Sequence, residues 1–121
     1  MNVEKDLAFP LSEYKDRLVR LREKMIERGL DVAMINSPEN MFYLSGYETP
    51  GYYAYQALVL PREAEPVMVV RLLEETNVLC YSWIEKRATY KDTEDPVDTT
   101  CRVLRELGAE KATIGLSLIH I

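Results

Sequence analysis

The stretch Asn40-Met41-Phe42-Tyr43-Leu44-Ser45-Gly46-Tyr47 decides how this 121-residue sequence is interpreted. It follows an apolar segment suited to a buried strand, and it is unusually aromatic for a connection between strands. Three more tyrosines follow at positions 52, 53 and 55. Connections normally run over the surface, so an apolar one either packs beneath the sheet or lines a pocket or a partner's face. Both outcomes bear on function.

Length and composition are those of a single globular domain. A chain this long buries roughly two thirds of the surface that its unfolded form exposes. Apolar residues make up 47% and charged residues 29%, which argues against disorder. The net charge is −5 and basic residues are interleaved with acidic ones, so we expect no nucleic-acid partner. No apolar run approaches the roughly 18 residues that span a bilayer, and no signal peptide is evident. We therefore expect a cytoplasmic protein without a membrane partner.

Hydrophobic periodicity and capping residues predict helices alternating with strands. Ser12 is the expected N-cap of the first helix, Gly29 follows its C-terminus, and Gly46 and Gly108 end two later helices. The predicted helices are 13–28, 39–44, 73–83 and 96–107, and the predicted strands are 30–35, 55–60, 67–72, 88–91 and 112–115. The strands 55–60 and 67–72 form the clearest hairpin. A helix followed at once by a buried strand predicts a layered α/β domain.

Two helix faces carry specific expectations. Glu13 and Arg17 have the favourable i,i+4 order, which predicts a solvated face on the first helix. Val97, Cys101 and Leu104 share one face of the last helix, with Val103 and Leu107 beside it, which predicts that this face is buried. Cys80 and Cys101 have no second cysteine or histidine at metal-ligand spacing, so we expect buried thiols and neither a disulfide nor a metal site.

The sequence contains no complete catalytic constellation. It lacks a phosphate-binding glycine loop, a G-x-S-x-G elbow, an H-E-x-x-H helix and a C-x-x-C pair, and we predict no catalytic or metal-binding residue. The acidic group Asp92, Glu94 and Asp95 fits no full calcium loop, so a solvated turn is expected. Glu74 and Glu75 are expected to be charges at a helix N-terminus. Arg71 could clamp a carboxylate, but a surface ion pair is the favoured role.

The last six residues, Leu-Ser-Leu-Ile-His-Ile, do not resemble the natural end of a domain. They match the in-frame translation of a transposase end used in sequencing libraries (CTG TCT CTT ATA CAC ATC). We therefore expect a domain at 1–115 and an adapter-derived artefact at 116–121. His120, the only histidine, carries no functional weight under this interpretation.

Several segments together resemble the N-terminal domain of the creatinase, prolidase and aminopeptidase P family. The resemblance covers nearly all of residues 9–115, and its most specific part is the aromatic-Leu-Ser-Gly-Tyr segment. The residues that carry it are Phe9-Pro10, Glu13-Tyr14, Arg17-Leu18, Gly29-Leu30-Asp31 and the run from Ser37 to Tyr47.

The resemblance implies a three-layer α/β fold of ribonuclease H-like type, in which helices flank a mixed sheet. It also implies a following catalytic domain of the pita-bread fold. In the peptidases of the family that domain holds two divalent metal ions, such as Mn, Co or Zn, whereas creatinase works without metal. The resemblance implies that the metal ligands, two aspartates, one histidine and two glutamates, belong to that following domain, so no cofactor is expected in this chain. The family further implies a homodimer in which the N-terminal domain overhangs the partner subunit's active site.

The resemblance also suggests which residues approach the substrate of the parent enzyme. Tyr52, Tyr53 and Tyr47 are the candidates, acting at the partner subunit's active site. Creatinase places a phenylalanine and an arginine against its substrate, and these positions correspond to Tyr52 and Ala54 here. The missing arginine argues against creatine, because a methyl group cannot clamp a carboxylate. A small peptide, such as an Xaa-Pro dipeptide, or a small amide, such as ectoine, remains open.

Two functions from different classes are therefore compatible with the sequence. One is the non-catalytic N-terminal domain of an Xaa-Pro peptidase-like or creatinase-like hydrolase, contributing to dimer assembly and substrate selection. The alternative is a stand-alone α/β binding module with an aromatic recognition surface. A stable monomer that keeps its aromatic segment protected would favour the second.

Overall fold

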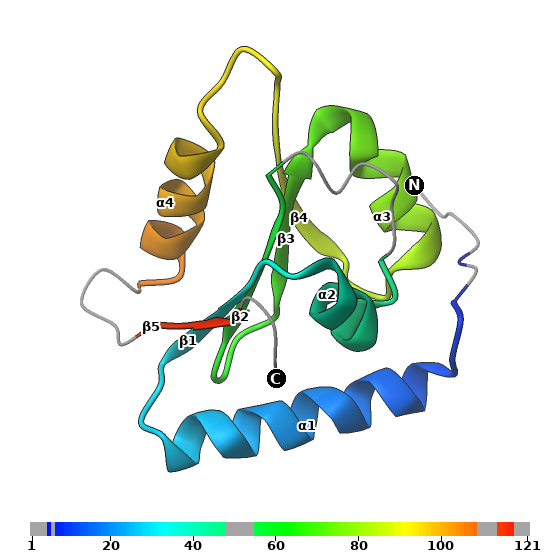
Figure 1. The fold of residues 1–121 in the computed structure, drawn as a ribbon, viewed down its shortest axis with the longest axis vertical. Coiled ribbons are helices and arrows are strands. Elements are labelled where there is room, and N and C mark those ends of the chain that lie inside the picture. Colours follow the sequence, from blue (N-terminus) through cyan, green and yellow to red (C-terminus); the bar gives the residue numbers. More distant parts are fainter. Residues whose placement is uncertain (1–4, 6, 48–54, 109–113, 118–121) are drawn as a thin grey trace.

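The apolar segments predicted as strands pair into one mixed sheet (Figure 1). The computed structural model describes residues 5, 7–47, 55–108 and 114–117. Strand order is β4-β3-β2-β1-β5. β2 is antiparallel to both β1 and β3, whereas β5 lies parallel to β1 and β4 parallel to β3. The strands are β1 (Val32–Ile35), β2 (Ala57–Pro61), β3 (Val67–Arg71), β4 (Lys86–Tyr90) and β5 (Ile114–Ser117).

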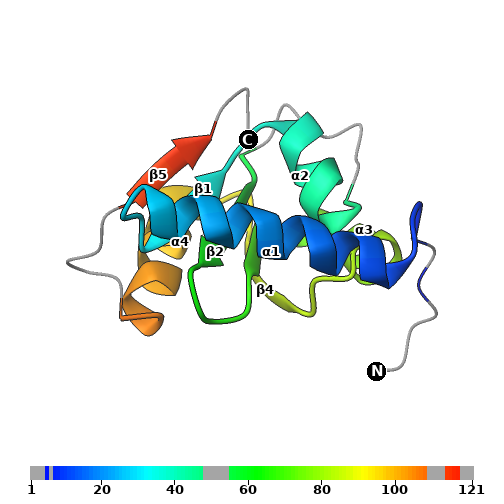
Figure 2. The same cartoon turned by 90° about the horizontal axis from the view of Figure 1, so that it is seen from below.

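Helices cover both faces of this sheet, which confirms the predicted three-layer architecture. Figures 1 and 2 show α1, α2 and α3 on one side of the sheet and α4 on the other. None of the described helices is long and apolar enough to cross a membrane. The helices are α1 (Leu11–Glu27), α2 (Pro38–Ser45), α3 (Glu75–Tyr81), which follows the 3₁₀ turn η1 (Leu72–Glu74), and α4 (Pro96–Glu106).

The central strands are buried on both faces, as their continuous apolar runs require. In β2 the residues Leu58 and Leu60 join the cluster beneath α1, α2 and α3, which includes Met25 of α1. The alternate residues Ala57 and Val59 join the cluster beneath α4. This alternation follows from the two-residue period of a strand. The predicted hairpin is confirmed by the pairing of β2 with β3.

The predicted start of the first helix is wrong by two residues, whereas its end is confirmed. α1 begins at Leu11, and Pro10 takes the N-cap position with an extended backbone. The Pro10 carbonyl oxygen accepts a hydrogen bond from Glu13 N at 3.0 Å. Proline has no backbone N–H and fits only at the start of a helix, so Pro10 and not Ser12 marks the boundary. At the other end Gly29 has φ +67°. Leu30 N donates to Met25 O at 2.9 Å there, completing a glycine-based C-cap.

The predicted apolar face of the last helix is wrong for Val97 and Cys101, which are exposed. Val103 is buried and Leu104 and Leu107 pack against the same cluster, as expected, and Thr99 and Thr100 are buried beside them. The Asp95 carboxylate caps the helix by accepting from Val97 N at 3.0 Å. Thr100 can turn inward because its hydroxyl donates to Pro96 O at 3.0 Å, leaving its methyl group to pack. A polarity pattern counts threonine as polar and therefore omits Thr99 and Thr100 from the buried face. The Cys101 thiol is thus exposed, contrary to expectation, and Cys80 is half-buried.

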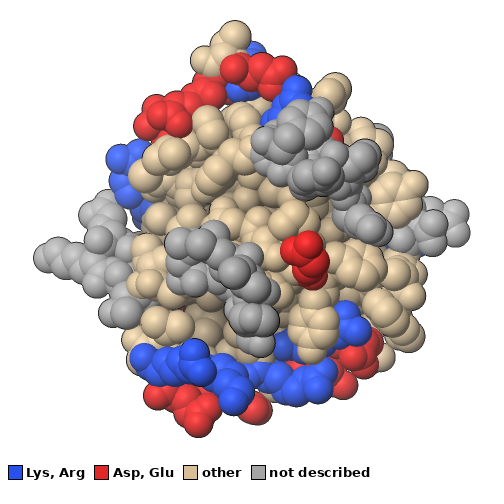
Figure 3. Space-filling view, in the orientation of Figure 1, with Lys and Arg blue, Asp and Glu red and all other residues tan. Residues whose placement is uncertain are grey.

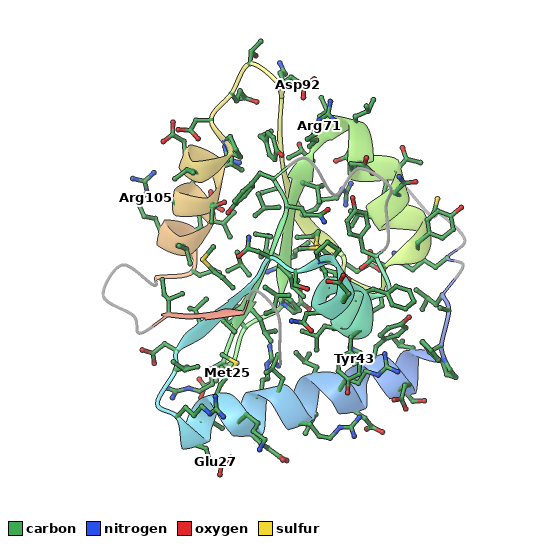
Figure 4. The ribbon with its side chains drawn as sticks, viewed as in Figure 1. Met25, Glu27, Tyr43, Arg71, Asp92 and Arg105 are labelled. Carbon is green, nitrogen blue, oxygen red and sulfur yellow. The ribbon has the colours of Figure 1, made fainter. Side chains whose placement is uncertain are left out.

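The first helix has one polar residue that is not solvated as predicted. Arg17 forms the expected ion pair with Glu13 at 3.1 Å, but its side chain is only 10% exposed. Its guanidinium lies 4.7 Å from the centre of the Phe9 ring and 4.3 Å from that of Tyr43. It also donates to Tyr43 O at 2.7 Å. Arg17 therefore ties α1 to α2 from between two aromatic rings, and Figure 4 shows Tyr43 in the space between these helices.

The last strand crosses the domain boundary predicted after residue 115. β5 pairs along its length with β1, from Val32 opposite Ile114 to Ile35 opposite Ser117. The adapter origin of residues 116–121 stays a prediction, and residues 118–121 lie outside the described part of the chain.

Candidate functional site

Most strands of the sheet finish at one and the same edge. β1, β3, β4 and β5 all end at this edge, and β2 begins there. We call this side of the sheet, formed by the C-terminal ends of four strands, the carboxyl edge. α2 starts from it, and Figure 2 shows the tip of β5 on the same side of the molecule as α2. The space-filling view shows few charged side chains at the centre of the molecule, with charges gathered along α1 and around the turn before α4 (Figure 3).

Tyr47 is the one predicted site residue that the structure describes, and it belongs to the core. Its side chain is 1% exposed and packs in the cluster beneath α1, α2 and α3. Its hydroxyl donates to Glu74 Oε2 at 3.2 Å, and Asn77 Nδ2 donates to the same oxygen at 2.8 Å. Tyr52 and Tyr53 lie outside the described residues. A role for any of these tyrosines near a substrate stays a prediction.

The Ser45-Gly46 pair fixes the position of Tyr47. Ser45 Oγ donates to Met41 O at 2.6 Å and accepts from Tyr47 N at 3.1 Å. Gly46 ends α2 with φ +82°, a conformation that side chains with a Cβ rarely adopt. A Cβ at this position would lie 2.8 Å from Tyr81 O and 2.9 Å from the Tyr14 hydroxyl. The glycine is therefore required both by the turn and by the close approach of two neighbours.

A second polar network holds the entry into β2. The Tyr90 hydroxyl donates to the carbonyl oxygen of Tyr55, the first described residue after position 47. The Tyr55 hydroxyl lies 3.0 Å from Thr100 Oγ1. Since that oxygen already donates to Pro96 O, Tyr55 is the donor. Burial raises the pKa of the Tyr90 hydroxyl above its ordinary value of 10.0. Sequence reasoning missed this network, because its members come from the chain just before β2, from β4 and from α4.

The charged groups of the carboxyl edge are engaged with one another. Arg71 donates to both carboxylate oxygens of Asp92, at 2.9 and 3.0 Å, and Figure 4 shows the two side chains meeting beyond the ends of β3 and β4. These hydrogen bonds hold the pKa of Asp92 below its ordinary value of 3.8. Glu94 accepts from Lys91 N at 2.7 Å. The predicted surface ion pair of Arg71 is confirmed, and the acidic turn is a local structural element.

The described ranges contain no group of three or more histidine, cysteine, aspartate or glutamate side chains able to hold a metal ion. Glu75, one of the two glutamates assigned to a helix N-terminus, is the first residue of α3 and pairs with Arg87 at 2.9 Å. The described carboxylates of this edge therefore serve hydrogen bonds and ion pairs within the domain.

Comparison with known families decides the identity of the fold. The family defined by the creatinase/prolidase N-terminal domain matches residues 17–121. The chain belongs to this family. Among curated proteins, the ectoine hydrolase of Halomonas elongata is 35% identical over 83 residues, covering 69% of this chain and 21% of that protein. The putative dipeptidase YkvY of Bacillus subtilis is 28% identical over 109 residues, covering 84% of this chain and 30% of that protein. The chain thus spans less than a third of either relative.

Solved structures agree on the fold. The N-terminal domain of an Xaa-Pro dipeptidase from Lactobacillus brevis superposes with a TM-score of 0.74 at 16% identity, covering 83% of this chain and 75% of that one. A dipeptidase from Pyrococcus horikoshii gives a TM-score of 0.72 at 24% identity, covering 87% of this chain and 29% of that one. The creatinase/prolidase N-terminal domain of a Streptococcus pyogenes X-Pro dipeptidase gives 0.66 at 17% identity, covering 86% and 93%.

The creatinase/prolidase N-terminal domain presents one apolar feature at its carboxyl edge that the sequence did not single out. Leu72 and Leu73 follow β3 in the η1 turn and are 46% and 76% exposed. Leu73 was expected only as an apolar residue of a helix. Its signal in the sequence was the Leu-Leu pair at the end of a strand, where polar residues normally begin a connection.

Proposed function

We propose that this chain is the non-catalytic N-terminal domain of a hydrolase that cleaves a small peptide or a small amide. Its family membership and its coverage of only 21% and 30% of two curated relatives support this proposal. Those relatives carry the names ectoine hydrolase and putative dipeptidase. The cleavage chemistry would then reside in a catalytic domain that follows this one, with two divalent metal ions held by ligands of that domain. The described residues do not form a metal site, so no metal-dependent step is assigned to them.

Within that enzyme the domain would select the substrate and support assembly of a homodimer. The observation that carries this role is the set of contacts made by Tyr47 and Tyr55, the described residues nearest to the candidates Tyr52 and Tyr53 in the sequence. Tyr47 is held by Glu74 from η1 on one side of the sheet, and Tyr55 by Tyr90 and Thr100 on the other. Residues held by packing and hydrogen bonds are a suitable support for neighbouring side chains that contact a substrate. The cytoplasmic location stays a prediction.

Kinetics of the parent enzyme test this role. An aromatic contact contributes about 0.5–1.5 kcal/mol, so Tyr52→Ala should raise KM or lower kcat/KM by about 2- to 12-fold. Tyr52→Phe should retain most of the activity, and Tyr81→Ala, which removes an exposed ring of α3, serves as the matched control. Xaa-Pro dipeptides and ectoine are the substrates to compare. Unchanged kinetics of Tyr52→Ala, or amide hydrolysis by the 121-residue chain alone, would contradict the proposal.

A further inference from the structure

Leu72 and Leu73 form an apolar surface at the carboxyl edge that nothing in the described structure covers. Leu73 is the most exposed of the large apolar side chains in the described ranges, at 76%. The charged groups on either side of the pair are already matched. Arg71 binds both oxygens of Asp92, and Glu75 lies 2.9 Å from Arg87. We call Leu72 and Leu73 the leucine surface.

Covering the leucine surface would be favourable for two reasons. Removing apolar side chains from water stabilises a complex in proportion to the area buried. Charges normally oppose burial at an edge, because an ion that loses water without a partner is strongly destabilising. Here the flanking charges would keep their partners within the domain when another surface approaches. The edge can therefore be desolvated without isolating a charge.

We propose that the leucine surface is where the catalytic domain of the same polypeptide docks onto this domain. This inference rests on the proposed function, since it requires a following domain. The two curated relatives extend far beyond the matched region, which is 21% and 30% of their lengths. β5, the last described strand, ends at the same edge as β3, which leads directly into Leu72. The strand pairings place Ser117, the end of β5, level with Met68 of β3, three strand spacings or about 14 Å away across the sheet.

A tethered domain fits this surface better than a second copy of the chain. A stable interface between separate molecules buries about 800 Å² on each partner, far more than two leucines supply. A domain joined to β5 by the chain itself meets the surface at a high effective concentration, so a small apolar contact is sufficient. The leucine surface therefore suits an intramolecular contact.

Thiol labelling tests the docking directly. Leu73→Cys is introduced into the 121-residue chain and into the parent enzyme, and Ile26→Cys, at a 62% exposed position of α1, is the matched control. Labelling rates with a maleimide are read peptide by peptide by mass spectrometry, with the exposed Cys101 as internal reference. We expect the rate at position 73 to fall at least tenfold between chain and parent, and the rate at position 26 to change less than twofold. Equal rates at position 73 in both proteins would overturn the proposal.

Two further outcomes separate this inference from the proposed function. Protection of position 73 in the isolated chain that disappears on dilution would identify a second copy as the occupant and would overturn the docking proposal. Hydrolysis is assayed on the same parent samples. An active parent without protection contradicts the docking alone, whereas a protected parent without amide hydrolysis supports the docking and contradicts the proposed function.

Discussion

Replacing Gly46 with alanine tests the link between the Ser-Gly-Tyr segment and the fold. Gly46 has φ +82°, and the left-handed conformation costs a residue with a Cβ about 1–2 kcal/mol. The new Cβ would also lie 2.8 Å from Tyr81 O, a backbone atom that cannot rotate away. Overpacking of this kind costs about 1–3 kcal/mol. We therefore expect Gly46→Ala to lower the free energy of unfolding by about 2–5 kcal/mol, a large part of the roughly 5–15 kcal/mol typical of a domain.

Two other glycines separate the conformational cost from the contact cost. Gly29 and Gly108 also have positive φ, at +67° and +72°, but nothing lies within 4 Å of a Cβ at either position. Alanine there should lower the free energy of unfolding by about 1–2 kcal/mol, which is the conformational cost alone. Urea unfolding followed by Trp83 fluorescence and by circular dichroism measures all three variants. A Gly46→Ala variant no less stable than the other two would refute the close packing of this turn.

Three further variants probe the contacts around the site by urea unfolding. Arg17→Met should lower the free energy of unfolding by about 1–3 kcal/mol, because it removes a cation between two rings and a hydrogen bond to a carbonyl. Asp92→Asn should be less stable than the natural chain at pH 7, since Arg71 lowers the pKa of Asp92. This difference should shrink once the pH falls below 3.8 and be lost as the pH falls through the lowered pKa of the folded carboxyl. Tyr90→Phe should cost about 0.5–1.5 kcal/mol through loss of the hydrogen bond to Tyr55 O. Because the pKa of Tyr90 is raised, its contribution is present below pH 10 and lost as the pH rises further, so the difference should shrink in alkali.

Each of these variants has a matched control in the chain. Arg20→Met removes a cation that is 63% exposed and should change the free energy of unfolding by less than about 0.5 kcal/mol. Glu63→Gln neutralises an exposed carboxylate of the β2–β3 turn. Its free energy of unfolding should change between pH 7 and pH 3 by the same amount as that of the natural chain. Tyr81→Phe tests removal of a hydroxyl from an exposed ring. Equal losses in variant and control would show that the assigned contact contributes nothing.

The fold was predictable because the decisive residues act locally. Gly29, Gly46 and Gly108 end helices where the sequence placed helix ends, and all three have positive φ. The turn between β2 and β3 follows from the polar residues around Pro61 and Pro66. Such signals depend on a few neighbouring residues, so they can be read without knowing what packs against them.

The errors arose where tertiary contacts decide. Thr100 is buried because its hydroxyl reaches Pro96 O and Tyr55, and no polarity pattern contains that information. Arg17 is buried because Phe9 and Tyr43 enclose it from two other segments. In the Tyr90 network, the hydrogen-bonded residues are separated by 35 and by 45 residues along the chain. Local hydrophobic periodicity contains no information about contacts between residues so far apart in the sequence.

The central claim is that this domain belongs to a hydrolase whose catalytic groups lie elsewhere. The most direct test is to determine the coding sequence that follows Gly115 in the source DNA. The measurement requires only long-read sequencing of the source DNA across this position. We predict a reading frame that continues into a second domain carrying the two aspartates, one histidine and two glutamates of a two-metal site. A reading frame that stops within a few codons, or a following domain without that ligand set, would contradict the claim.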